Sequence, residues 1–390
     1  MTRTTNHSII IGDAGRTTAL PTESVHLVVT SPPYPMIAMW DDLFCSRSAR
    51  VADMLEKSKG GDAFELMHQD LEPVWDLVYR VLKPGGFACI NIGDATRKVG
   101  DDFCLYANHA RLLHYLTKIG FSVLPDILWR KQTNSPTKFM GSGMLPAGAY
   151  VTLEHEYILI VRKGGKRVFK ANAEMHNRRQ SAIFWEERNE WFSDVWLDLK
   201  GAVQSLGGRG ARSRSGAFPF ELAYRLINMY SAKGDTVLDP FAGTGTVLAA
   251  AMAACRNSAG VELDPTLIPA IRESIEEIVP FANQRIDLRL ETHQQFVAER
   301  AEQGKPIKYT NQHYGFPVVT NQEKELLINA LEKVHTLGDL AWSVDYSLEP
   351  QAAYCFENHA AADMEAVEVK KAASRKNTGQ MTLFEDNKKK

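Results

Sequence analysis

Short apolar runs that alternate with helical patterns constrain the fold of this chain most strongly. Runs that predict buried strands occur at residues 7–12, 24–30, 87–92, 122–129, 236–238 and 258–262. Stretches with the 3.6-residue spacing of a helix lie between most of them, at residues 63–82, 104–119, 220–231 and 246–254. This alternation predicts an α/β protein with a doubly wound, mostly parallel sheet and helices on both of its faces.

The composition narrows the class of protein. A chain of 390 residues has room for one large domain and a smaller module. The five cysteines are scattered without a Cys-x-x-Cys pair, which argues against a zinc site or a disulfide framework and fits a reducing cytoplasm. No apolar run approaches the roughly 18 to 20 residues that cross a bilayer. We therefore expect a soluble cytoplasmic protein.

The segment Ser31-Pro32-Pro33-Tyr34 follows one predicted strand and has the composition of a site that holds a planar amine. An exocyclic amine becomes a good nucleophile only when hydrogen-bond acceptors favour the state in which its nitrogen rehybridises and gains positive charge. Ser31 offers a side-chain oxygen, and Pro32 offers a carbonyl whose direction is restricted because Pro33 follows it. Tyr34 offers an aromatic face for a base flipped out of a duplex. Taken alone, the segment could also be a proline-rich turn.

A second strand end has the features of a nucleoside site. Gly243-Thr244-Gly245 opens a predicted helix, so a ligand can approach its backbone amides closely, although the third glycine of a dinucleotide fingerprint is missing. Glu262 ends the next predicted strand, where its carboxylate could accept hydrogen bonds from both ribose hydroxyls. The predicted cofactor-binding residues are Phe218, Pro219 and Leu222 on its flank, and Asp239, Pro240, Phe241, Gly243, Gly245, Thr246 and Glu262 around it.

Together these patterns resemble the amino-group DNA methyltransferases. The chain contains Ser-Pro-Pro-Tyr, then Phe-Pro-x-x-Leu, Gly-Asp-x-Val-Leu-Asp-Pro-Phe-x-Gly-x-Gly-Thr and Val-Glu-Leu-Asp, in the order of the permuted class called beta. The resemblance covers residues 7–265 and includes Trp129, Lys131 and His155-Glu156. It implies a Rossmann-like methyltransferase fold, S-adenosylmethionine as cofactor and double-stranded DNA as substrate, and therefore association with the nucleoid. It also implies that Asp13 contacts the adenine of the cofactor, with a turn or cap residue as the alternative.

The first residue of the catalytic motif bears on the target base. A serine at this position is similar to the cytosine-N4 methyltransferases, whereas adenine-N6 enzymes more often carry Asp or Asn. No cysteine follows a proline, which disfavours cytosine-C5 methylation because that reaction needs a thiol nucleophile. We expect transfer to cytosine N4, with adenine N6 as the alternative.

Three other functions are compatible with parts of the pattern. The missing glycine and the Ser-Pro-Pro-Tyr segment count against a Rossmann oxidoreductase. A methyltransferase of RNA or of protein glutamine would share Pro-Pro-Tyr, but those families more often show Asn first. A non-catalytic DNA-binding module would bind the cofactor without transferring a methyl group.

The βα pattern breaks down between residues 130 and 216, where only residues 155–162 indicate a strand. This region holds fifteen Lys or Arg against eight Asp or Glu, so we predict that it recognises DNA. Arginine binds both phosphate and guanine, although any one of these side chains could instead lie in a solvated loop. The candidates are Arg178, Arg179, Arg209, Arg212 and Arg214.

The patterns divide the chain into five segments. They are a catalytic half over residues 1–129 with a loop at 35–61, the recognition region over 130–216, a cofactor half over 217–265, a helical extension over 266–359 and a disordered tail over 360–390. The tail contains Gln380-Met381-Thr382-Leu383-Phe384, which resembles the short peptides that dock on bacterial sliding clamps. A cognate restriction endonuclease is the other candidate partner.

Overall fold

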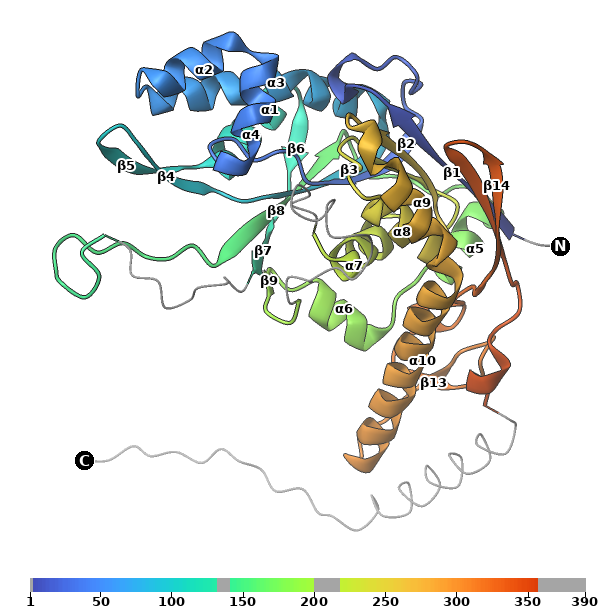
Figure 1. Ribbon diagram of the computed structural model, residues 1–390. Coiled ribbons are helices and arrows are strands. Elements are labelled where there is room, and N and C mark those ends of the chain that lie inside the picture. Colours follow the sequence, from blue (N-terminus) through green and yellow to red (C-terminus); the bar gives the residue numbers. More distant parts are fainter. Residues whose placement is uncertain (1–2, 132–140, 200–217, 357–390) are drawn as a thin grey trace, which may run out of the picture.

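A single large sheet forms the centre of the described residues, which are 3–131, 141–199 and 218–356 in this computed structural model (Figure 1). Its strands are β1 (Arg3–Ile11), β2 (Val25–Thr30), β3 (Leu82–Ile92), β6 (Phe121–Val123), β7 (Ile127–Arg130), β8 (His155–Lys163), β9 (Val195–Trp196), β10 (Thr236–Asp239), β11 (Asn257–Glu262), β14 (Leu331–Gly338) and β15 (Ala341–Tyr346). Their order is β14-β15-β1-β11-β10-β2-β3-β8-β7-β9, with β6 beside β8. The five strands from β1 to β3 in this order pair in parallel, which confirms the predicted sheet.

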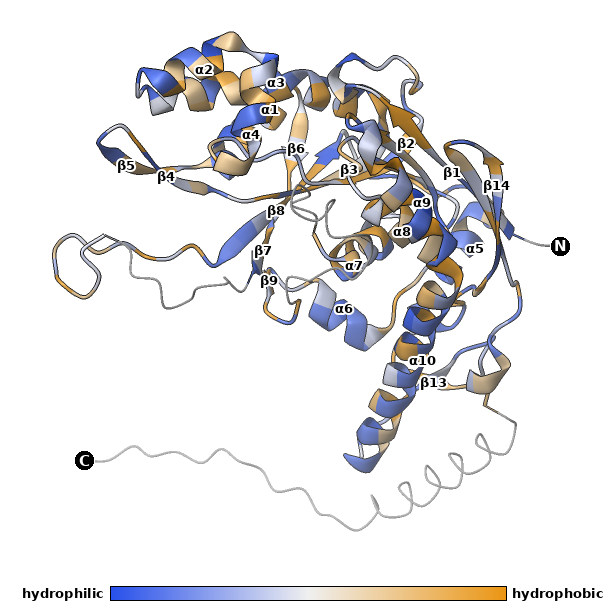
Figure 2. Cartoon of the chain, viewed as in Figure 1, coloured by the Kyte–Doolittle hydropathy of each residue, from blue (hydrophilic) through white to orange (hydrophobic). Residues whose placement is uncertain are grey.

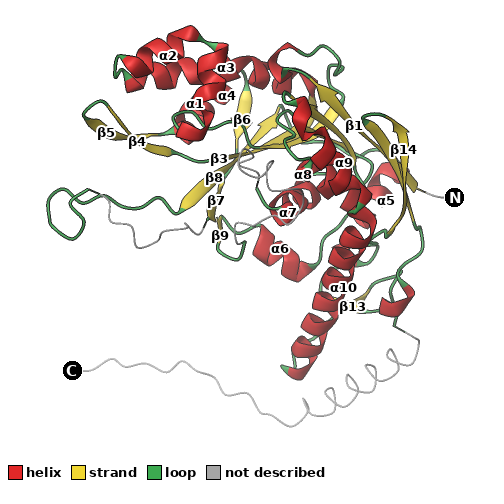
Figure 3. Cartoon of the chain, viewed as in Figure 1, coloured by secondary structure: helices red, strands yellow, loops and turns green. Residues whose placement is uncertain are grey.

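Helices cover both faces of this sheet (Figure 3). The helices are α1 (Asp41–Arg47), α2 (Ala49–Glu56), α3 (Gly60–Val81), α4 (Asn108–Lys118), α5 (Asn172–Gln180), α6 (Trp185–Trp191), α7 (Phe220–Tyr230), α8 (Thr246–Ala253), α9 (Ile268–Glu276) and α10 (Ile278–Glu302). Leu27 and Val29 of β2 pack in one buried cluster with α7 and α8, whereas Val28 packs in the other with α3. Because side chains alternate along a strand, one buried strand supplies both layers. Accordingly, β2 is largely hydrophobic in Figure 2, whereas the start of β1 is polar.

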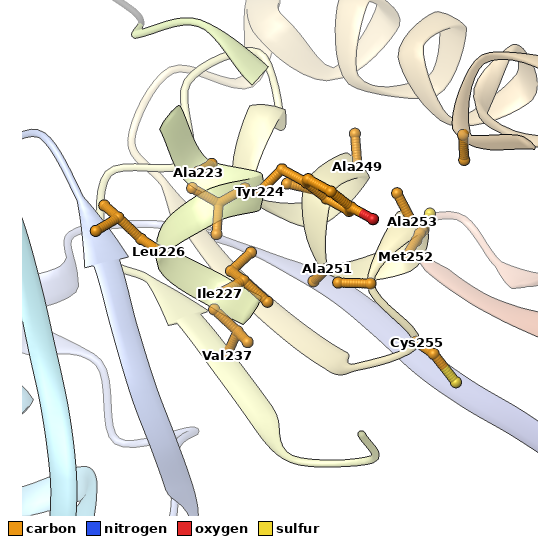
Figure 4. Close-up of a cluster of buried hydrophobic side chains, with 14 of the residues drawn as sticks. Ala223, Tyr224, Leu226, Ile227, Val237, Ala249, Ala251, Met252, Ala253 and Cys255 are labelled. Carbon is orange, nitrogen blue, oxygen red and sulfur yellow. The ribbon is translucent and has the colours of Figure 1, made fainter. Parts of the chain in front are cut away.

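Small side chains let α7 and α8 pack closely on one face. Figure 4 shows Tyr224 and Ile227 of α7 beside Ala249 and Ala251 of α8, all in one buried cluster. Alanine adds little bulk between two helices, so α8, which starts directly after the glycine loop Gly243-Thr244-Gly245, lies close against α7. This packing fixes where that loop lies relative to the sheet.

The remaining elements are short. They are the hairpin of β4 (Ala95–Val99) and β5 (Asp102–Tyr106), the pair β12 (Tyr309–Thr310) and β13 (Pro317–Val318), and the 3-10 helices η1 (Ala14–Arg16), η2 (Ala38–Trp40), η3 (Pro265–Leu267), η4 (Asn321–Glu323) and η5 (Ala352–Tyr354). The β4–β5 hairpin follows β3 almost directly, so it projects from the edge of the sheet at which β3 ends (Figure 1).

Several sequence-based expectations differ from the structure. The strand expected over residues 122–129 is two short strands, β6 and β7, which both pair with β8, and β9 is an additional strand beside β7. Residues 35–61 were expected to be a loop, but they include α1 and α2, whose Phe44 and Val51 are buried in the cluster beneath α3. The helix expected from residue 104 begins at Asn108, because residues 102–106 pair with β4.

The helical extension expected over residues 266–359 is helical only as far as α10. Its later part forms β14 and β15, and β15 pairs antiparallel with β1. This hairpin covers an edge of the parallel sheet that would otherwise expose unpaired backbone groups. Within β15, Trp342, Ser343, Val344 and Tyr346 are buried and the other two residues are half-buried, so this strand lies inside the sheet.

Candidate active site

The two strand-end motifs lie side by side in the structure. β2 and β10 are parallel neighbours, with Leu27 paired to Val237 and Val28 to Leu238, so both strands end at the same edge of the sheet. There Thr30 donates a hydrogen bond from Oγ1 to Oδ1 of Asp239 over 2.6 Å. One bond thus connects the residue before Ser31 to the first residue of the glycine loop. The carboxyl edge of an open α/β sheet is where such proteins bind ligands.

Asp239 shapes the turn from inside the protein. Its side chain is 3% exposed, and the backbone N–H of Phe241 donates to the same Oδ1 over 3.0 Å. Burial raises the pKa of Asp239 to about 7, because an ionised carboxylate is poorly solvated there. Asp239 therefore fixes the path of the chain through Pro240, which is also buried.

The glycine loop is held by the end of the next strand. Glu262 accepts a hydrogen bond from Gly243 N at 2.7 Å through one oxygen and from Asp264 N at 2.8 Å through the other. Burial raises the pKa of Glu262 above its usual value. Gly243 and Gly245 have φ angles of 55° and 81°, a backbone region that favours glycine, and Gly245 is the N-cap of α8.

The loop has the space and the donors and acceptors that a nucleoside cofactor needs. A Cβ placed on Gly243 would meet only Phe241 O, at 3.9 Å, so this side of the loop is open to a ligand. A carboxylate has about four acceptor sites, so Glu262 keeps lone pairs for ribose hydroxyls beyond its two backbone bonds. Thr246 starts α8, whose first N–H groups lie at the same edge. These residues fit S-adenosylmethionine.

Asp13 lies beside Glu262, because β1 and β11 pair through Ile11 and Glu262 and Gly12 N donates to Glu262 O over 2.8 Å. Its carboxylate caps η1 by accepting from Gly15 N at 2.8 Å and pairs with Arg47 at 3.0 Å. The structure thus shows the capping role that was the alternative for Asp13. Contact with the adenine of the cofactor stays a prediction.

The residues predicted to line the flank of the cofactor lie at the start of α7. Pro219 is the N-cap of this helix, and Phe218, Pro219 and Leu222 are all buried. Phe218 and Leu222 belong to the buried cluster that also contains Ala242 of the glycine loop. They therefore belong to the same hydrophobic core as that loop, and direct contact with the cofactor stays a prediction.

A hydrogen-bonded network surrounds the catalytic motif. Ser31 Oγ donates to the Tyr34 hydroxyl over 3.0 Å, and that hydroxyl donates to Oε2 of Glu156 over 3.0 Å. Asn91 Nδ2 donates to both, over 2.8 Å to Tyr34 and 2.7 Å to Glu156. Lys131 Nζ donates to the other oxygen of Glu156 over 2.9 Å. Motif analysis gave no role to Asn91, which the fold brings here on β3.

The surroundings of Tyr34 hold its ring in one place. Burial and the nearby Glu156 carboxylate raise the pKa of Tyr34 well above its usual value. A Cβ on Gly93 would lie 3.0 Å from Tyr34 Cε2 and 3.3 Å from Glu156 Cγ, so a glycine lets the two side chains meet. Asn91 Oδ1 is buried without a hydrogen-bond partner among the described residues, which costs about 1–3 kcal/mol in a typical protein. Such costs are common at functional sites.

The arginines predicted to contact DNA are not gathered at this edge. Arg178 and Arg179 lie on α5, where Asn177 bonds to Arg3 at the start of β1 and to Lys233 O just before β10 (Figure 1). That is the opposite edge of the sheet from Ser31. Arg179 pairs there with Glu325 at 3.2 Å, so the structure gives these two side chains no place beside the catalytic motif. Arg209, Arg212 and Arg214 lie outside the described residues, as do residues 380–384.

The described residues contain no group of three or more His, Cys, Asp or Glu side chains placed to hold a metal ion. None of their helices is long and apolar enough to cross a membrane.

Comparison with known proteins identifies the family. The sequence matches the N6/N4 methyltransferase family, described as DNA methylase, over residues 25–273, which is more than half of the chain. The chain belongs to this family. It is therefore a DNA methyltransferase that acts on amino groups and uses S-adenosylmethionine, and the predicted Rossmann-like fold is confirmed.

Individual relatives agree with this assignment. The chain is 50% identical to the type II methyltransferase M.MthZI of Methanothermobacter thermautotrophicus over 323 residues, which cover 83% of this chain and 90% of the relative. It is also 50% identical to the type II methyltransferase M.MjaI of Methanocaldococcus jannaschii, over 70% of this chain and 92% of the relative. The crystal structure of a DNA modification methylase from Thermus thermophilus, in complex with S-adenosyl-L-methionine, shares 32% identity with a TM-score of 0.55 and covers 70% of this chain and 95% of that one.

Proposed function

We propose that this protein transfers a methyl group from S-adenosylmethionine to the exocyclic N4 amine of a cytosine flipped out of duplex DNA. The observation that carries the proposal is the hydrogen bond from Ser31 Oγ to Tyr34. Because the serine proton is used in that bond, the serine oxygen can only accept from a substrate amine. An acceptor is what a developing ammonium nitrogen needs.

The proposed roles follow from the positions of the residues. Bound S-adenosylmethionine supplies an electrophilic methyl group whose bond to sulfur breaks with its electron pair left on sulfur. Glu262 and the amides around Gly243 would hold the nucleoside part of this cofactor at the end of β10 and β11. Ser31 Oγ and the carbonyl oxygen of Pro32 would accept hydrogen bonds from the target amine, and Tyr34 would stack on its ring.

The choice of cytosine over adenine rests on the serine at position 31. The cytosine-N4 enzymes resemble this chain there, whereas adenine-N6 enzymes more often carry Asp or Asn. Adenine N6 is the second candidate, since its amine needs the same acceptors. A cognate restriction endonuclease and a sliding clamp are proposed partners. The clamp is tested separately by a pulldown with the full-length protein and with a Leu383→Ala/Phe384→Ala variant of the peptide at residues 380–384. Equal retention of clamp by both proteins would contradict this partner.

Expression in a host that lacks DNA methylation tests the target base. Single-molecule sequencing of the host genome should find a modified cytosine at a fixed position in one short sequence. The Ser31→Ala variant, expressed at the same level, should leave that sequence unmodified. Modification of adenine instead of cytosine would show that adenine N6 is the target. A genome without any modification would contradict the proposal.

A further inference from the structure

The hydroxyl of Tyr34 has every hydrogen-bonding position filled. A phenol has one proton to donate and two lone pairs to accept with. Around Tyr34 there are three partners within 3.0 Å, namely Ser31 Oγ, Asn91 Nδ2 and Glu156 Oε2. With three partners and three positions, the direction of each bond can be worked out from the chemistry of the partners.

The carboxylate decides these directions. Glu156 is paired with Lys131 at 2.9 Å, and an ionised carboxylate can only accept, so the Tyr34 proton points to Glu156. Asn91 also contacts Glu156 Oε2, at 2.7 Å, so its NH₂ group must face that side, and this NH₂ group donates to Tyr34 as well. The remaining position on Tyr34 is a lone pair, and Ser31 must fill it as a donor.

The network is built from separate strands that the sheet holds in register. Asn91 lies on β3, Glu156 on β8 and Lys131 directly after β7, and Glu156 is paired with Trp129 across β7 and β8. Lys131 Nζ lies 5.5 Å from the centre of the Trp129 ring, which limits where its ammonium group can go. The side chain of Glu156 is 12% exposed, and its partners keep it in one position.

We propose that Glu156, held by Lys131, is a positioning residue that acts through Tyr34 on Ser31 and receives the proton that the target amine loses. Its carboxylate keeps the Ser31 oxygen as an acceptor before transfer. The amine lone pair then forms the bond to the methyl carbon as the methyl–sulfur bond breaks. The nitrogen gives its proton to Ser31 Oγ, Ser31 gives its own to Tyr34, and Tyr34 gives its own to Glu156, which becomes neutral until solvent takes the proton.

This inference rests on the proposed amino methylation, and a double-mutant cycle tests it. Tyr34→Phe and Glu156→Gln each interrupt this proton relay from Ser31 to Glu156 with little change in side-chain shape. Each should lower the single-turnover rate of methyl transfer to unmethylated plasmid DNA by about 10²-fold, the lower end for an acid–base group. The double variant should be no slower than either single variant, because both changes break the same proton relay. KM for DNA should stay unchanged in all three.

Asp53→Asn is the control. Asp53 pairs with Lys57 at 2.7 Å on the surface of α2, outside the region predicted to recognise DNA, and its side chain is 44% exposed. It should transfer methyl groups at the wild-type rate. An unchanged rate in Tyr34→Phe, which loses one oxygen atom and keeps its ring, would overturn the proposal. So would a double variant whose loss is the product of the two single losses.

A second measurement needs neither cofactor nor DNA. In protein labelled at tyrosine Cζ with carbon-13, the signal of Tyr34 is identified by its loss in Tyr34→Phe. Because the Glu156 carboxylate raises the pKa of Tyr34, Glu156→Gln should lower that pKa, whereas Asp53→Asn should not. Equal pKa values of Tyr34 in wild type and Glu156→Gln would overturn the proposed proton relay. Failure of the wild type to methylate DNA, with this shift present, would instead contradict the proposed function.

Discussion

Replacing Asp239 with asparagine should change how stability depends on pH. In the folded protein, burial raises the pKa of Asp239 to about 7 from an ordinary value of 3.8. Between these two values the folded state keeps a proton that the unfolded state releases, so the free energy of unfolding falls as pH rises. The full shift of about three units corresponds to about 4 kcal/mol of stability that is present at low pH and lost above pH 7.

Asparagine keeps the side-chain oxygen that accepts from Thr30 and Phe241, but it does not titrate. Wild type should therefore lose about 2 to 3 kcal/mol relative to Asp239→Asn between pH 5 and pH 8, which is the part of the shift that this range covers. Urea unfolding of both proteins at a series of pH values measures this difference, provided that the m value stays constant.

The control for this prediction is Asp101→Asn. Asp101 is fully exposed in the turn between β4 and β5, so its variant reports the loss of a surface carboxylate alone. Its difference from wild type should be the same at pH 5 and pH 8. If Asp239→Asn also differs from wild type by a constant amount, the conclusion that burial raises the pKa of Asp239 in the folded protein is refuted.

Four further changes test other parts of the site and the fold. Ser31→Ala should lower kcat by about 10²-fold or more, as loss of one preorganised hydrogen-bonding group does, while calorimetry finds cofactor binding unchanged. Glu262→Ala should weaken S-adenosylhomocysteine binding by about 10- to 100-fold in the same assay, because ribose hydroxyls and Gly243 N lose a charged acceptor. Gly260→Ala should cost about 1–3 kcal/mol in urea unfolding, since the new Cβ would lie 2.6 Å from Ile9 Cδ1 in the core. Arg289→Met should cost about 3–5 kcal/mol by leaving Glu187 without its 2.6 Å partner, and adding Glu187→Leu should recover much of that loss.

The sequence was sufficient to predict the sheet and both loops for a physical reason. Buried parallel strands are continuous apolar runs, and the turns that follow them need glycine or proline, so the sequence alone predicts that Ser31 and Gly243 lie at strand ends. Their adjacency follows only from the strand order, which puts β10 beside β2. Periodicity does not encode that order, and neither does it reveal the bond from Thr30 to Asp239.

The side chains that complete the site were harder to predict. Asn91 is one polar residue in a buried strand, and its partner Glu156 comes from an antiparallel strand far along the chain. Composition also could not predict where Arg178 and Arg179 lie, because a locally basic region contains residues from both edges of the sheet, and their contact with DNA stays a prediction. The hairpin of β14 and β15 was missed because the helical patterns before it were extended too far.

The most direct test of the central claim is to identify the methylated nucleoside. Purified protein, S-adenosylmethionine with a deuterated methyl group and unmethylated duplex DNA are incubated together, and the DNA is digested for mass spectrometry against chromatographic standards. The account predicts deuterated N4-methylcytosine, and none with Ser31→Ala. Deuterated N6-methyladenine would keep amino methylation and contradict the interpretation of Ser31. Absence of any deuterated nucleoside, with cofactor binding intact, would contradict the account of the site.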